Sequence, residues 1–134
     1  MRIGLIGCGF FAQNHLNAWR DLSSEGAVLT SVCDIDPAKA KAAAAEFGAP
    51  RWYSDVVEML DAEKLDLVDI VTRMDTHRAI VTETLARNIP TVVQKPFAPA
   101  IEECMAMAEM ASKAGTFLAV HENFRFQKRY TTQP

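Results

Sequence analysis

The chain has 134 residues, 49% of them hydrophobic, which is enough for one domain with a buried core. Its net charge of -3 and the lack of a basic run argue against nucleic acid as the main partner. No apolar run approaches the ~20 residues of a membrane span, and the glycine-interrupted start "MRIGLIGCGFF" lacks the features of a signal peptide. We therefore expect a cytoplasmic protein without a membrane partner.

Apolar runs of strand length alternate with segments of helical periodicity, a pattern typical of a parallel sheet covered by helices. We predict six strands, near Arg2–Ile6, Val28–Cys33, Arg51–Tyr53, Leu67–Thr72, Thr91–Gln94 and Thr116–Val120. Five helices are predicted between them, near Phe10–Leu22, Pro37–Phe47, Asp55–Ala62, Thr76–Asn88 and Ala100–Ala114. Right-handed crossovers then give one doubly wound α/β Rossmann domain over residues 1–120, with strand order 3-2-1-4-5-6.

Capping residues mark several of these helix boundaries. Asp36 can cap the second helix, with Pro37 at its first helical position, and Ser54 is a plausible cap for the third. Gly48 and Gly115 follow the second and last helices, where a left-handed residue commonly ends a helix.

The first strand runs directly into "GCGFFA", which has the spacing G-x-G-x-x-A and precedes a helix. Gly7 permits the tight turn, Gly9 lets a pyrophosphate approach the backbone, and Ala12 allows close packing of helix and strand. Phe10 and Phe11 complete the loop. The amides at the helix start would then face the phosphates, so the segment predicts a dinucleotide-binding loop.

A carboxylate lies at the expected distance after this loop. The second strand ends in "VCDID", and Asp34 follows the loop by ~25 residues, where a carboxylate accepts hydrogen bonds from the adenosine ribose. A 2'-phosphate would meet negative charge there, and neither Ile35 nor Asp36 supplies an arginine for it. NAD is therefore favoured over NADP. Asp34 could instead be a turn or cap residue, but Asp36 suits that role better.

The fourth strand ends in "TRMDTH" at the edge where a cofactor would pass. Thr72 could reach its ribose or phosphate, and Asp75 or Thr76 could cap the next helix. His77 is open between a cofactor-binding role and local capping. His15, one turn into the first helix, is more simply structural.

The stretch "TVVQKPFAPA" begins as an apolar strand and ends on a lysine before a proline. Because proline fixes its own φ and restricts the residue before it, Lys95 is presented at a defined angle where the strand stops. Two readings are open at this point. Lys95 could belong to a site, or its aliphatic stem could cover the end of the sheet.

No metal centre or disulfide framework is expected. The three cysteines are odd in number and lack a CxxC spacing: Cys8, Cys33 and Cys104. Three methionines near the last of them recur at apolar helical positions, which predicts core packing rather than metal binding: Met105, Met107 and Met110.

These segments, in this order, resemble the amino-terminal domain of the glucose-fructose oxidoreductase, inositol dehydrogenase and MocA family over nearly the whole chain. Members carry G-x-G-x-x-[GA], T-P-x-x-x-H, E-K-P and a segment with Asn and Arg. Here these positions read "GCGFFA", "TRMDTH", "QKP" and "HENFRF". The resemblance implies an NAD-dependent dehydrogenase that moves a hydride between nicotinamide and a secondary alcohol of a sugar, inositol or related polyol.

The resemblance also assigns a role to Lys95. The family's lysine faces nicotinamide and substrate, which makes Lys95 the expected catalytic residue and a cofactor contact. An ammonium there can stabilise the alkoxide that develops as hydride leaves. Two departures stand out, since Gln94 replaces the usual glutamate and Arg73 replaces the usual proline.

Family members have a second α/β domain that supplies most substrate contacts, and residues 121–134 are expected to begin the connection to it. His121, Asn123 and Arg125 are candidates for the edge of the substrate cleft, although each could equally be a hinge or interface residue. We expect the 134 residues alone to be inactive. The alternative is a catalytically silent NAD-binding sensor or interaction module, which would not need Lys95. Whether the chain forms a homo-oligomer is left open.

Overall fold

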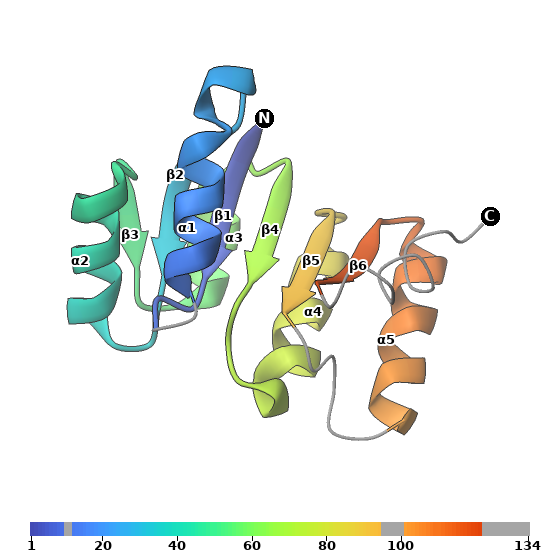
Figure 1. The fold of residues 1–134 in the computed structure, drawn as a ribbon. Helices are drawn as coiled ribbons and strands as arrows, with labels where there is room; N and C mark the ends of the chain where they lie inside the picture. The colour runs from blue at the N-terminus through green and yellow to red at the C-terminus, as the bar shows by residue number, and fades with distance from the viewer. Residues whose placement is uncertain (10–11, 95–100, 122–134) are drawn as a thin grey trace.

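A six-stranded parallel sheet forms the centre of the molecule (Figure 1). The computed structural model describes residues 1–9, 12–94 and 101–121. The strands are β1 (Arg2–Ile6), β2 (Val28–Cys33), β3 (Arg51–Tyr53), β4 (Leu67–Ile70), β5 (Thr91–Gln94) and β6 (Leu118–His121). Every neighbouring pair is parallel, and the order β3-β2-β1-β4-β5-β6 confirms the predicted doubly wound topology.

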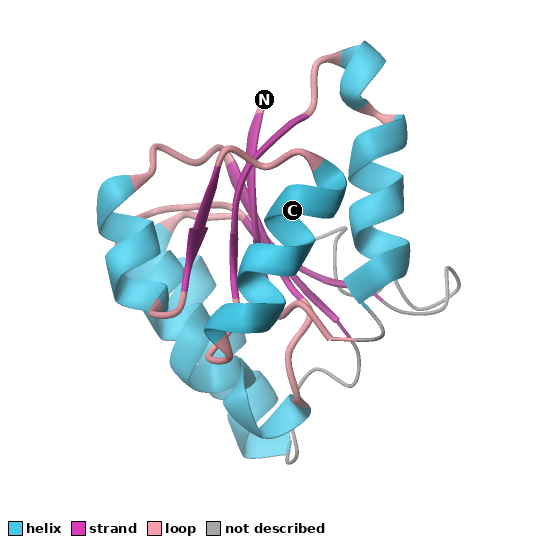
Figure 2. Ribbon diagram, turned by 90° about the vertical axis from the view of Figure 1, so that its left-hand side faces the viewer, coloured by secondary structure: helices cyan, strands magenta, loops and turns pink. Residues whose placement is uncertain are grey.

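Helices cover both faces of the sheet (Figure 2). They are α1 (Ala12–Asp21), α2 (Pro37–Phe47), α3 (Val56–Ala62), α4 (His77–Ala86) and α5 (Ile101–Ala114), with two 3-10 turns at Ser23–Glu25 and Met74–Thr76. The first two helices contact each other on one face, and the other three form a contiguous layer on the opposite face. This two-sided cover is the reason that the strands read as nearly continuous apolar runs.

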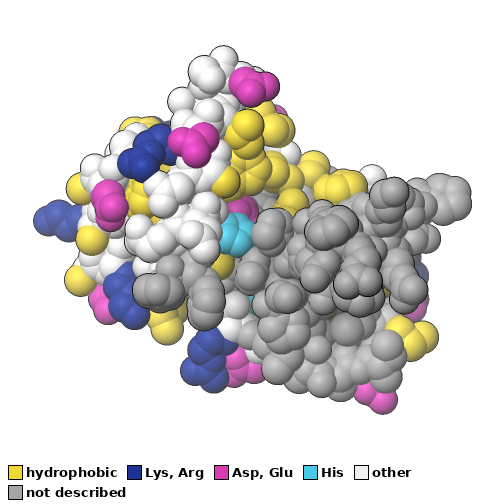
Figure 3. Space-filling view, viewed as in Figure 1, with side chains coloured by type: hydrophobic (Ala, Val, Ile, Leu, Met, Phe, Trp, Pro, Cys, Tyr) yellow, Lys and Arg dark blue, Asp and Glu magenta, His cyan; other side chains and the backbone are white. Residues whose placement is uncertain are grey.

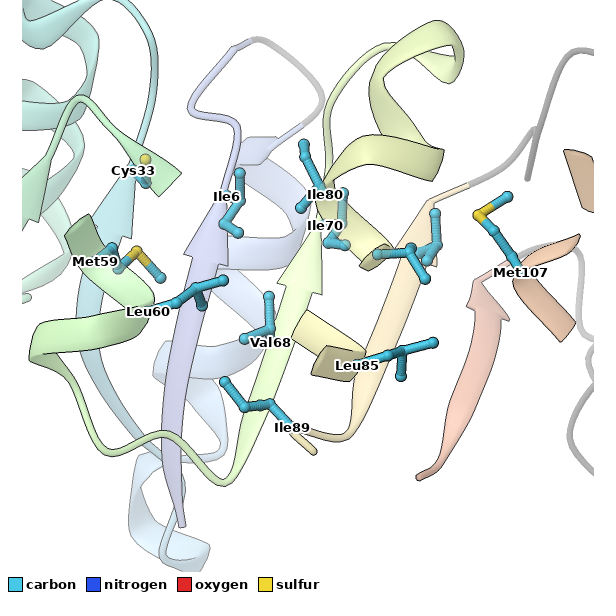
Figure 4. Packing of buried hydrophobic residues seen from close by; sticks show 12 residues of the cluster. Ile6, Cys33, Met59, Leu60, Val68, Ile70, Ile80, Leu85, Ile89 and Met107 are labelled. Carbon is cyan, nitrogen blue, oxygen red and sulfur yellow. The ribbon is translucent and has the colours of Figure 1, made fainter. Parts of the chain in front are cut away.

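The larger core cluster lies between the sheet and the layer of α3, α4 and α5 (Figure 4). Met59 from α3, Val81 from α4 and Met107 from α5 are all completely buried. Met110 packs partly against the same cluster, whereas Met105 is 65% exposed. Core packing is thus confirmed for two of the three methionines. It is wrong for Met105, because a residue two positions from a buried one lies on nearly the opposite side of a helix.

Most of the predicted caps are confirmed. The Asp36 carboxylate accepts a hydrogen bond from the Ala38 N–H at 3.0 Å, and Gly48 and Gly115 have φ values of 78° and 66°. The prediction for Ser54 is wrong. Asp55 caps α3 by accepting from the Glu58 N–H at 3.0 Å, because the helix begins one residue later than predicted.

A buried carboxylate joins the edge strand β3 to the rest of the fold. Glu63 is only 6% exposed, and it accepts hydrogen bonds from Arg51 Nε at 2.5 Å, Arg51 Nη2 at 3.0 Å and the Tyr53 hydroxyl at 2.6 Å. Arg2 Nη2 lies 3.7 Å from the same carboxylate. The hydrogen bonds from Arg51, with a smaller contribution from Tyr53, lower the pKa of Glu63 below its ordinary value.

We expect the substitution Glu63→Gln to reduce stability at neutral pH by about 1–3 kcal/mol, because it weakens hydrogen bonds to a charged group. A lowered folded-state pKa means that the contribution is present above the ordinary pKa of 4.5 and is lost as the pH falls through the folded-state pKa. The difference in the free energy of unfolding between Glu63→Gln and the parent should therefore become smaller at acid pH. Urea unfolding at a series of pH values measures it.

Asp61→Asn is the matched control, because Asp61 also accepts from an arginine, Arg87 Nε at 2.9 Å, but its side chain is 63% exposed. It should change stability by less than about 0.5 kcal/mol. Equal effects of the two substitutions at every pH would contradict the special role of Glu63.

Candidate cofactor site

A pocket of about 470 Å³ opens at the carboxyl ends of β1, β2 and β4. The glycine loop forms one part of its lining, and the segments after β2 and β4 form the rest. Ligands of doubly wound sheets bind at this edge, where the strand order reverses. The topology therefore brings together three segments that the sequence analysis had singled out: Gly7 and Gly9, Asp34, and Thr72.

Gly7 is wedged between two neighbouring strand ends. Its φ is +101°, a conformation that L side chains rarely adopt, and an added Cβ would lie 2.6 Å from the carbonyl oxygen of Val71. Its N–H donates to the carbonyl of Cys33 at 2.7 Å. Glycine is thus required here by both conformation and space.

Gly9 has the opposite surroundings. Apart from its two chain neighbours, no atom of the described residues lies within 4 Å of a Cβ added there, so this part of the chain leaves the space over its backbone open. The carbonyl of Gly9 accepts from the N–H of Ala12, which is buried at the start of α1. This is the geometry expected of a backbone that a pyrophosphate can approach closely. Phe10 and Phe11, also predicted to bind cofactor, lie outside the described residues.

The Asp34 carboxylate is held by two backbone donors. Its Oδ2 accepts from the Cys8 N–H at 2.8 Å and its Oδ1 from the Asp36 N–H at 2.8 Å. Lys39 was not recognised from the sequence, but it also lines the pocket, as does Arg73. Among the described residues, the charged groups of the lining are thus these two cations and three carboxylates, including Asp75.

The segment after β4 is fixed by hydroxyl and imidazole contacts. Thr76 Oγ1 lies 2.6 Å from both Thr72 Oγ1 and the Arg73 carbonyl, and it makes no cap to α4. The Asp75 carboxylate accepts from Arg73 Nη2 at 2.9 Å. The predicted capping of α4 by the side chain of Thr76 is therefore wrong, because its hydroxyl bonds to the preceding turn.

His77 is completely buried, and its Nε2 lies 3.0 Å from the carbonyl oxygen of Thr72. Since a carbonyl can only accept, Nε2 carries the hydrogen in this contact. His77 is not part of the pocket lining. His77 holds the backbone of Thr72, which does line the pocket, and a direct contact of His77 with the cofactor stays a prediction.

A second buried cluster orients α1, the helix that follows the glycine loop. Asp69 in β4 accepts from His15 Nδ1 at 2.7 Å and from Trp19 Nε1 at 2.9 Å, both through Oδ2. This confirms a structural role for His15. The sequence offered no local sign of it, because the partners are 54 and 50 residues apart and meet only when β4 pairs with β1.

Two thiols lie near the pocket but are poor nucleophiles. Burial, with a smaller contribution from the charge of Asp34, raises the pKa of both Cys8 and Cys33 to about 12. Neither thiol is therefore expected to supply a thiolate at neutral pH.

The remaining predicted site residues are not placed. Lys95, Asn123 and Arg125 lie outside the described residues, and of His121 only the backbone is described. Gln94, which precedes Lys95, is in register with His121 across the β5–β6 ladder. The ladder thus brings the two predicted active-site segments to neighbouring strand ends.

On the face drawn in Figure 3, Lys and Arg side chains of the described residues are interspersed with Asp and Glu and form no continuous basic patch. None of the helices in the described part of the chain combines the length and apolar character that crossing a bilayer needs.

The comparisons with known proteins agree with this site. The family model "Oxidoreductase family, NAD-binding Rossmann fold" matches residues 1–122. D-apiose dehydrogenase from Paraburkholderia graminis is 46% identical over 123 residues, which cover 92% of this chain and 32% of that protein. Inositol 2-dehydrogenase 2 from Saccharopolyspora erythraea is 30% identical over 115 residues, which cover 86% of this chain and 34% of that protein.

Among solved structures, an oxidoreductase from Agrobacterium radiobacter in complex with NAD+, L-tartaric acid and magnesium matches with a TM-score of 0.88 and 40% identity. The match covers 94% of this chain and 36% of that one. The chain thus spans roughly a third of the length of the relatives that it matches.

Proposed function

Because the chain belongs to the oxidoreductase family with an NAD-binding Rossmann fold, we propose that it is the cofactor domain of a dehydrogenase acting on a sugar, inositol or related polyol. The reaction is hydride transfer between nicotinamide and a secondary alcohol. The observation that carries the cofactor assignment is the open space over Gly9 beside the fixed carboxylate of Asp34, at the edge where the strand order reverses.

The residues present suit NAD. Among the described residues, the space over Gly9 is open for a pyrophosphate, and the Asp34 carboxylate uses two of its roughly four acceptor positions on backbone donors. Within this part of the chain, two positions remain for the two adenosine ribose hydroxyls. When bound, NAD supplies the hydride chemistry, and the chain supplies its binding and orientation.

For the reaction itself we propose Lys95 as the catalytic residue, on the family resemblance of "QKP". Its ammonium would donate a hydrogen bond to the reacting hydroxyl and stabilise the alkoxide as hydride leaves. The names of the relatives, D-apiose dehydrogenase and inositol 2-dehydrogenase, support a sugar or polyol as substrate.

The lengths of these relatives support a parent protein with a second domain, which would supply most substrate contacts. Residues 121–134 would begin the connection, with His121, Asn123 and Arg125 near the substrate cleft. A cytoplasmic location stays a prediction.

The cofactor assignment is tested by calorimetric titration of the chain with NAD+ and NADP+. We expect NAD+ to bind more tightly, because Asp34 accepts from ribose hydroxyls and repels a 2'-phosphate. Asp34→Ala should weaken NAD+ binding and reduce the difference in affinity between NAD+ and NADP+. Equal or tighter binding of NADP+ by the parent chain would overturn the assignment.

A further inference from the structure

Asp34 connects two parts of the pocket that are distant in the sequence. Its side chain reaches back 26 residues to accept from the N–H of Cys8, which lies between the two glycines of the loop. Its own N–H donates to the carbonyl of Tyr53 at 3.1 Å, which ties its backbone to β3. The carboxylate is thus anchored on β2 and β3 and holds the loop that follows β1.

The Cys8 N–H belongs to the peptide that follows the left-handed residue Gly7. The peptide before Gly7 is also fixed, because the Gly7 N–H donates to the Cys33 carbonyl. The Val71 carbonyl leaves no room for a Cβ on Gly7. With the Asp34 contact added, the peptides before and after Gly7 are both bonded to the end of β2. Beyond Cys8 the loop reaches Gly9 and the open space above it.

We propose that Asp34 is a positioning residue for the phosphate-binding loop in addition to being the ligand of the adenosine ribose. This inference rests on the proposed function and deepens it. The carboxylate holds the Cys8 peptide in the orientation that presents Gly9 to the pyrophosphate. Phosphate and ribose recognition are therefore coupled through one side chain, and the loss of Asp34 weakens phosphate binding even when no ribose hydroxyl is present.

The strength of the contact supports such a role. A hydrogen bond from a backbone N–H to a carboxylate is charge-assisted and stronger than one between neutral groups. Without Asp34 the Cys8 N–H would lose its partner, and the loop would lose the contact that orients its second half. Ordering that loop again would oppose ligand binding.

The test compares NAD+ with an NAD+ analogue whose adenosine ribose lacks both the 2' and 3' hydroxyls. Both are titrated by calorimetry into the parent chain, Asp34→Ala and Asp34→Asn. If Asp34 only binds the ribose, its removal affects NAD+ and not the analogue. If it also positions the loop, Asp34→Ala lowers the affinity for the analogue as well, by about tenfold on the strength of a charged hydrogen bond. Asp34→Asn keeps one acceptor oxygen, so its affinity for the analogue should lie between that of the parent chain and that of Asp34→Ala.

Amide hydrogen exchange in the ligand-free chain gives a second readout. Exchange at Cys8 should be faster in Asp34→Ala by about tenfold or more, while exchange at Gly7, whose partner is the Cys33 carbonyl, should change much less. A general loss of stability would accelerate both amides together.

Asp55→Ala is the matched control, because it also removes a carboxylate that accepts from a backbone N–H, in this case at the start of α3 and outside the pocket lining. It should leave both affinities within about twofold.

Unchanged affinity of Asp34→Ala for the analogue would overturn the positioning role and leave the proposed function intact. An analogue that fails to bind the parent chain would also count against it, since a preformed loop should hold the diphosphate. Failure of the parent chain to bind NAD+ would overturn the proposed function, and this inference with it.

Discussion

Replacing Gly9 by valine is expected to abolish detectable NAD binding while leaving the fold intact. Apart from its chain neighbours, no atom of the described residues lies within 4 Å of a Cβ added at this position, so the described part of the fold leaves room for a side chain. The isopropyl group would instead occupy the space that a pyrophosphate needs above the loop. Calorimetric titration with NAD+ measures the loss, and circular dichroism with urea unfolding shows whether the variant is folded.

Gly7→Ala is the contrasting variant in the same loop. Its φ of +101° and the 2.6 Å approach of a Cβ to the Val71 carbonyl predict a loss of stability of at least about 1–2 kcal/mol, before any effect on binding. The two substitutions should therefore have different effects: Gly9→Val lowers NAD affinity, and Gly7→Ala lowers stability. A folded Gly9→Val variant that binds NAD+ with parental affinity would place the phosphate site elsewhere.

The order of the strands could be predicted because the connections leave few choices. Once strands alternate with helices, right-handed crossovers and the glycine loop after the first strand indicate a doubly wound sheet. The ends of the elements were less well predicted. β4 ends at Ile70 rather than Thr72, and β6 begins at Leu118 rather than Thr116, because pairing with neighbours rather than local apolar character decides where a strand stops.

Within the site, residues whose position depends on local chain geometry could be predicted to lie together. Gly7, Gly9 and Asp34 belong to a motif in which turn, loop and strand end are set by nearby sequence, and the structure brings them to one pocket. The role of His77 could not be decided in the same way. Its sequence neighbours suggested the cofactor edge, but its side chain turns inward to the Thr72 carbonyl.

Contacts between distant segments were not visible in the sequence at all. The bond from the Cys8 N–H to Asp34 joins the loop after β1 to the end of β2, and the cluster around Asp69 joins α1 to β4. An isolated aspartate in an apolar strand gives no indication of its partners until the sheet order is known. Such contacts are nevertheless the ones that orient the loop and the helix of the predicted phosphate site.

The second large effect concerns turnover. We expect the 134 residues to bind NAD+ but to show no multiple-turnover dehydrogenase activity on sugars or polyols. Lys95 could polarise a substrate oxygen, but efficient transfer also needs a positioned substrate and a group that accepts its proton. Orientation alone can contribute several kcal/mol, and general base catalysis typically adds about 10²–10⁴-fold. In the proposed parent protein both contributions come largely from a second domain.

The assay follows NADH absorbance across a panel of sugars and polyols, with NAD+ binding by the same preparation measured in parallel so that a folded, cofactor-competent chain is established. The sequence offers His121 as the residue that could replace the missing base. Robust turnover by the isolated chain, lost in Lys95→Ala or His121→Ala, would show that this domain is an enzyme by itself. Binding without turnover, together with activity in the parent protein that falls in Lys95→Ala, would support the lysine as the catalytic residue and exclude a purely sensory role.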